Sequence, residues 1–171
     1  QQIWRSLEDY ILHTEAAEKD LKICVFTGPV LRKLDPFFVT EVNGESIQLP
    51  TLFWKIVYFK KKSDGKIHRV GFLMNQSTLL FENGIAEEAV LEAVPTDEDR
   101  LFMEFDQAET YQVNVGTIEK LTGLSFTDAE EPFKDKRKIP LILNEVDVRE
   151  SLNESADPYT QLGFKIGGLE I

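Results

Sequence analysis

Apolar residues recur at three- and four-residue spacing at the start of the chain, and this period predicts an amphipathic helix that runs to about Ala17. The residues that form the apolar stripe are Ile3, Trp4, Leu7, Tyr10 and Ile11. Glu8 follows Trp4 by four residues and so lies at the edge of this stripe. A carboxylate at such an edge is either a boundary residue of the helix or a functional group.

Segments rich in β-branched and aromatic residues predict the strands of a sheet. The predicted strands are 21–29, 47–62, 67–76, 110–115 and 139–143. We expect the first of them to end at the turn signal Gly28-Pro29. The sequence "SDGK" at 63–66 predicts a hairpin turn between the second and third of these strands. Asn43-Gly44 predicts another tight turn.

The pattern as a whole predicts an α+β fold with a mainly antiparallel sheet and flanking helices. We expect the sheet to be built from the strands near Ile23, Phe53, Gly71 and Val113, with the first helix packed on it by its Trp4 face. A short helix is predicted at 116–123, with Gly123 as its C-terminal cap. No clean period is seen from 85 to 94.

Composition limits the class of protein. With 171 residues, 42% of them hydrophobic, the chain can bury one core, so we expect one domain and no extensive disorder. No apolar run approaches the roughly 20 residues that a membrane-spanning helix needs. The net charge is −11, so any binding of nucleic acid must be local. Lysine clusters at 60–66 and 134–138 could contact phosphates or could simply be solvated turns.

Common catalytic patterns are absent from the sequence: there is no phosphate-binding glycine loop, no G-x-S-x-G and no paired cysteines. The single cysteine, Cys24, is expected to be a small buried hydrophobic residue. His13 and His68 are the only histidines, and we expect both to be solvated surface residues rather than a general base.

Three stretches resemble the DNA/RNA non-specific endonucleases, the family that carries the ββα-metal motif, and together they cover most of residues 1–126. They are "WRSLEDYI", "KICVFTGPVL" with "LPTLFWKIVY", and "YQVNVGTIEKLTGLSF". The resemblance implies that the chain begins at the helix of the ββα-metal motif, without its two strands. We therefore expect residues 1–126 to be the C-terminal part of the nuclease domain, and 127–171 a C-terminal extension of it.

The resemblance implies an endonuclease that hydrolyses phosphodiester bonds in DNA and RNA without sequence specificity. The expected cofactor is Mg²⁺, or another divalent cation such as Mn²⁺. The family's helix carries Asn, Trp and Glu at four-residue intervals. Trp4 and Glu8 match the last two. Glu8 is therefore the candidate catalytic residue, which would contact the metal through water and orient the waters around it.

Other residues implied by the resemblance are not found in the sequence. The metal-binding Asn would fall immediately before Gln1, and the family's Asp-Arg-Gly-His segment, which holds the histidine base, is absent. We therefore expect a missing N-terminal half of the same protein, and we expect the 171-residue chain alone to be inactive. Without that half, the fragment could pair with a second copy as a homodimer.

Two further expectations come from the resemblance alone. Thr27-Gly28-Pro29 and Thr122-Gly123 match family positions that look structural, whereas Lys55 matches a position to which no role can be given. A secreted or periplasmic location is favoured. The alternative to a nuclease is a catalytically degenerate, nuclease-like module with a binding or structural role.

Overall fold

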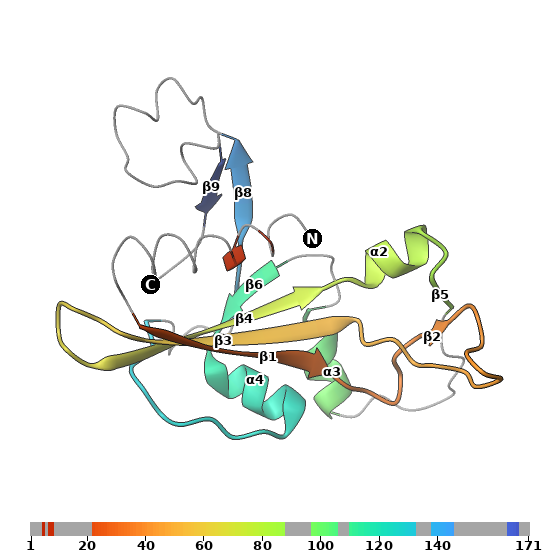
Figure 1. Ribbon diagram of the computed structural model, residues 1–171, viewed down its shortest axis with the longest axis horizontal. Coiled ribbons are helices and arrows are strands. Elements are labelled where there is room, and N and C mark those ends of the chain that lie inside the picture. Colours follow the sequence, from red (N-terminus) through yellow and green to blue (C-terminus); the bar gives the residue numbers. More distant parts are fainter. Residues whose placement is uncertain are drawn as a thin grey trace.

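The computed structural model describes residues 5, 7, 8, 22–87, 97–105, 110–132, 138–145 and 164–167. Its central feature is a five-stranded sheet in which every neighbouring pair is antiparallel (Figure 1). In spatial order the strands are β1 (Ile23–Val30), β3 (Leu52–Lys60), β4 (Ile67–Asn75), β6 (Thr110–Val113) and β7 (Lys138–Pro140). The predicted α+β class with a mainly antiparallel sheet is confirmed.

Smaller elements surround this sheet. The short pairs are β2 (Phe37–Phe38) with β5 (Ala86–Glu87), and β8 (Ile142–Glu145) with β9 (Phe164–Gly167). The helices are α2 (Ser77–Glu82), α3 (Asp97–Met103) and α4 (Val115–Thr122). In the predicted first helix, Arg5, Leu7 and Glu8 are helical. Trp4 and the other residues of that helix, His13 among them, lie outside the described residues, so the predicted packing of its Trp4 face stays a prediction.

The central sheet has two different faces because side chains alternate along each strand. Trp54 and Ile56 of β3 belong to the core that includes Val115 and Ile118 of α4. The intervening residue Lys55 therefore points to the opposite face. Figure 1 shows α3 and α4 below the sheet and the N-terminal segment, in red, above it.

The turn predicted at Gly28-Pro29 is wrong, because β1 continues to Val30. Gly28 lies beneath the indole of Trp54, where an added Cβ would be 3.0 Å from Cζ2. The Trp54 Nε1 donates a hydrogen bond to the carbonyl of Pro29 at 3.2 Å. β1 is an edge strand among the described residues, and an edge strand is where a sheet tolerates a proline.

The edge position of β1 also corrects the environment expected for Cys24, which is exposed rather than buried. His68, in contrast, is less exposed than predicted. Its side chain is only 12% exposed, stacks on Phe59 at 5.7 Å between ring centroids, and places Nε2 2.7 Å from Asp64 Oδ2. It is therefore a largely enclosed residue and not the solvated one predicted.

Helix α4 is capped at both ends. The side chain of Asn114 accepts a hydrogen bond from the backbone N–H of Thr117, and Gly123 ends the helix with a left-handed φ of 69°. The predicted cap at Gly123 is confirmed. Both caps come from residues that satisfy backbone groups at the ends of a helix.

Replacing Gly123 by Ala is expected to lower the free energy of unfolding by about 1 kcal/mol, because a Cβ is unfavourable at positive φ. Gly116→Ala in the same helix is the matched control. Gly116 has no positive φ, and its added Cβ would make only an ordinary contact at 3.5 Å, so this change should be neutral or stabilising. Urea unfolding of both variants measures the difference, and equal effects would contradict the cap.

Candidate active site

An ion pair joins the first helix to the centre of the sheet. The Nζ of Lys55 in β3 donates a hydrogen bond to Oε1 of Glu8 at 2.5 Å. The two side chains differ sharply in exposure: Lys55 is 4% exposed and Glu8 is 46% exposed. The pair therefore presents a carboxylate to solvent and keeps the cation beneath it.

The sheet places Lys55 in a confined position. In the register of the strands, Lys55 is opposite Thr27 of β1 on one side and Phe72 of β4 on the other. Phe72 and its own neighbour Gln112 are fully buried. Burial lowers the pKa of Lys55, and the hydrogen bond and charge of Glu8 oppose this shift without cancelling it. The carboxylate of Glu8 thus offsets part of the cost of burying the amine.

The half-exposed carboxylate fits one role at a metal centre. Mg²⁺ keeps several of its waters when it binds a protein, and a nearby carboxylate orients such waters without binding the ion directly. Glu8 has carboxylate oxygens that solvent can reach, so it suits this contact through water. Within the described ranges, no three His, Cys, Asp or Glu side chains gather to hold an ion by themselves.

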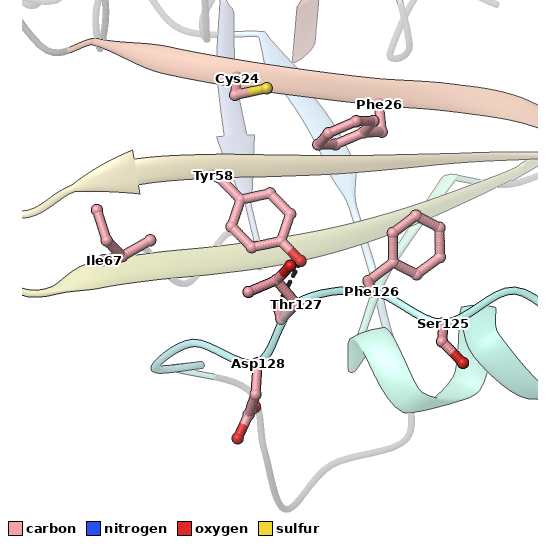
Figure 2. A pocket seen from close by; sticks show the side chains of 8 residues that line it. All are labelled: Cys24, Phe26, Tyr58, Ile67, Ser125, Phe126, Thr127 and Asp128. Atoms are coloured by element: carbon pink, nitrogen blue, oxygen red, sulfur yellow. Dashed lines mark hydrogen bonds between the residues drawn. The ribbon is translucent and has the colours of Figure 1, made fainter.

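The opposite face of the sheet carries a pocket of about 450 Å³ (Figure 2). It is lined by Cys24, Phe26, Tyr58, Ile67, Ser125, Phe126, Thr127 and Asp128. Tyr58 lies three residues beyond Lys55 along β3, and alternation puts the two side chains on opposite faces. The pocket is therefore separate from the Glu8–Lys55 pair.

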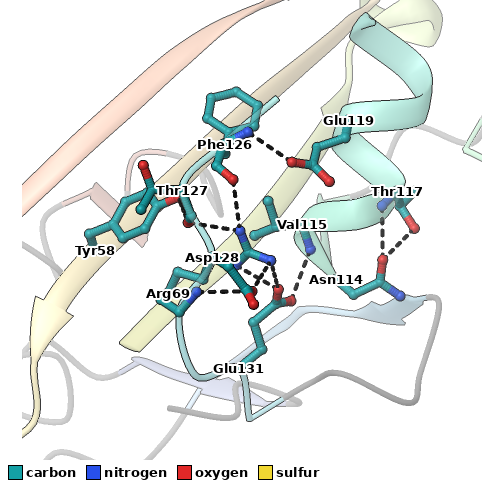
Figure 3. A network of polar contacts seen from close by, with 11 residues as sticks. Tyr58, Arg69, Asn114, Val115, Thr117, Glu119, Phe126, Thr127, Asp128 and Glu131 are labelled. Carbon is teal, nitrogen blue, oxygen red and sulfur yellow. Dashed lines mark hydrogen bonds and ion pairs between the residues drawn. The ribbon is translucent and has the colours of Figure 1, made fainter. Parts of the chain in front are cut away.

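A polar network lies on the pocket's side of the sheet (Figure 3). At its centre Arg69, 8% exposed, contacts Oε1 of Glu131 through Nε at 2.7 Å and Nη2 at 2.6 Å. The other oxygen of Glu131 accepts a hydrogen bond from the N–H of Val115, the first residue of α4, at 3.0 Å. Burial would lower the pKa of Arg69, but hydrogen bonds with Tyr58 and Glu131 outweigh it and raise the pKa.

This network fixes the segment after α4 onto the sheet. Arg69 also donates to the carbonyl of Thr127 at 2.9 Å, and the hydroxyl of Tyr58 donates to the same carbonyl at 2.7 Å. The network thus joins β3, β4, the start of α4 and the chain that follows it. We interpret it as structural. The sequence did not reveal it because Arg69 is 58 and 62 residues away from its partners Thr127 and Glu131.

The lysine cluster at the hairpin between β3 and β4 is exposed at Lys60, Lys62 and Lys66. Lys66 forms an ion pair with Glu130 at 2.9 Å, and both side chains are more than half exposed. Residues 134–137 of the second cluster lie outside the described residues. No described helix is long and apolar enough to cross a membrane.

The structure is thus that of an α+β protein in which a half-exposed helix carboxylate is held by a buried lysine on one face of the sheet. The chain matches the family model of the DNA/RNA non-specific endonucleases over residues 1–133 of its 171. The chain belongs to this family, and the family is one of nucleases. No curated protein and no solved structure gives a significant match.

Proposed function

We propose that the protein is a divalent-metal-dependent endonuclease that hydrolyses phosphodiester bonds in DNA and RNA without sequence specificity. The cofactor we propose is Mg²⁺, for which Mn²⁺ can substitute. The observation that supports the site is the Glu8–Lys55 ion pair, in which a solvent-facing carboxylate is held by a buried amine at 2.5 Å. Family membership over residues 1–133 supports the nuclease class.

In this proposal Glu8 accepts hydrogen bonds from waters around the cation and holds them in one orientation. The bound cation would stabilise the negative charge that develops on the phosphate and on the leaving oxygen. Lys55 holds the carboxylate in place through its hydrogen bond from the sheet. Because Lys55 belongs to the middle of a strand with a partner strand on each side, its own position is well defined.

The general base is proposed to come from residues outside these 171, either in the same polypeptide or in an associated chain. Asp-Arg-Gly-His does not occur in the sequence. His68 shares the face of Lys55, because it pairs with Phe59 and Phe59 is four residues from Lys55. That separation is about 13 Å along the strand, too far for His68 to act on water held by Glu8.

Full-length protein is expected to degrade both supercoiled plasmid and RNA in the presence of Mg²⁺. EDTA should abolish the cleavage and added Mg²⁺ should restore it, because the cation stabilises the charge formed at phosphorus. The isolated 171-residue chain should show no metal-dependent cleavage. Gel electrophoresis of the products measures both expectations.

Three outcomes of these assays would contradict the proposal. Cleavage by the full-length protein that persists in EDTA would exclude a metal mechanism. An inactive full-length protein would favour the degenerate nuclease-like module. Cleavage by the isolated chain would show that its own residues include the base.

A further inference from the structure

Lys55 is an unusual residue for its place in the fold. Its neighbours on the same face of β3 are Phe53 and Val57, and the residue opposite it in β4 is the fully buried Phe72. Desolvating an ammonium group in such surroundings is unfavourable, and an apolar side chain of similar size would pack there at no such cost. Packing of the sheet therefore does not explain why this position carries an amine.

The contact with Glu8 does explain it. Glu8 is a half-exposed residue on a helix, and a free glutamate there would sample several side-chain rotamers. The ammonium group of Lys55 fixes one carboxylate oxygen at 2.5 Å and leaves acceptor positions on the carboxylate for water. One buried cation thereby restricts the geometry of an exposed anion.

We propose that Lys55 is a positioning residue: it holds the Glu8 carboxylate in the orientation that organises the waters of the cation, and it does not touch the nucleic acid. The inference rests on the proposed function and adds a residue to it. With a side chain that is 4% exposed, Lys55 cannot reach a phosphate of the substrate. It should therefore act on turnover and not on binding.

Lys55→Met in the full-length protein tests this role. We expect kcat to fall by about 10- to 100-fold, the usual effect of removing a group that orients a metal-site residue. KM for plasmid DNA should change little. The slope of log binding affinity against log salt concentration should also stay the same, since each phosphate contact that is lost reduces it by about one.

A double-mutant cycle shows whether Lys55 acts through Glu8. The double variant Glu8→Gln/Lys55→Met should be no less active than Glu8→Gln alone, because the contact has already been lost. Lys33→Met is the control: this exposed lysine lies in the loop after β1, outside both lysine clusters, and should leave kcat unchanged. Lys55→Arg, which keeps the charge, should retain more activity than Lys55→Met.

Binding of Mn²⁺, followed by the electron paramagnetic resonance of the free ion, gives a readout that does not depend on turnover. Lys55→Met and Glu8→Gln should each weaken Mn²⁺ binding by about tenfold, and the double variant should resemble Glu8→Gln. Circular dichroism establishes that each variant is folded. If Lys55→Met does not fold, Lys55→Gln takes its place in every comparison.

The outcomes separate the inference from the proposed function. A full-length protein that neither cleaves nucleic acid nor binds Mn²⁺ would overturn both. If the full-length protein does both, unchanged kcat and Mn²⁺ affinity in folded Lys55 variants would overturn the role of Lys55 alone. A reduced salt slope in Lys55→Met would also overturn it, because Lys55 would then contact phosphate.

Discussion

Glu8→Gln is expected to lower kcat for DNA and RNA hydrolysis by about 100-fold while the protein stays folded. Glutamine keeps the shape of the side chain but removes its charge, and its amide donates hydrogen bonds where a carboxylate accepts them. The waters of the cation would lose their oriented acceptor. Initial rates on plasmid and on RNA, measured at saturating Mg²⁺, provide the comparison.

The stability of Glu8→Gln should fall by roughly 1–3 kcal/mol, because the buried ammonium group of Lys55 loses its carboxylate partner, although the side-chain oxygen of glutamine can still accept its hydrogen bond. Glu130→Gln is the matched control. Glu130 is also an exposed carboxylate paired with a lysine, Lys66, but it belongs to the segment beside the hairpin. Its replacement should leave kcat unchanged. An active Glu8→Gln variant would remove Glu8 from the site.

Arg69→Met is expected to lower the free energy of unfolding by about 3–5 kcal/mol. The Glu131 carboxylate, whose side chain is 6% exposed, would lose the cation that compensates its burial. The hydrogen bond from Arg69 that holds the Thr127 carbonyl would be lost as well. A loss of this size corresponds to a fall in Tm of about 10 °C for a protein of this length, measurable by thermal unfolding.

Two comparisons test the origin of that loss. Lys66→Met breaks an exposed ion pair and should change stability far less than Arg69→Met does. Arg69→Met/Glu131→Leu removes both buried charges and should be more stable than Arg69→Met. A double variant as unstable as the single one would show that the packing of Arg69, and not the unpaired Glu131, accounts for the effect.

The elements predicted correctly are those whose structure is decided by the residues within them. The strand at 67–76 and the helix at 116–123 were confirmed within a residue or so as β4 and α4, because their period and turn residues agree with their final environment. The six-residue α2 and seven-residue α3 were not predicted, since they are too short to establish a helical period. The strand expected at 139–143 is divided into β7 and β8.

Errors arose where the position of a strand within the sheet decides the outcome. Gly28-Pro29 has the composition of a turn, yet an edge strand accommodates both residues. Cys24 was expected to be buried because it lies in an apolar run, but the same edge leaves it exposed. Neither result follows from the residues near it in sequence.

Of the two residues of the Glu8–Lys55 pair, only Glu8 was assigned a role from the sequence. Glu8 was identified through the resemblance to the nuclease family, and its role there stays a prediction. Lys55 was matched but had no assigned role, because the residue it contacts is 47 positions away. A charged residue in the middle of the apolar run "LFWKIVYF" was the available signal, since a buried amine requires a partner.

Cys24 gives the fold a practical property. It is the single cysteine among the 171 residues, it is exposed, and it belongs to the pocket on the face opposite the Glu8–Lys55 pair. A thiol-reactive fluorophore or surface linker would therefore attach this chain at one known point. The face of the sheet with the Glu8–Lys55 pair would remain accessible. In a single-molecule experiment, a tethered molecule would then present its candidate active site to long DNA and away from the support.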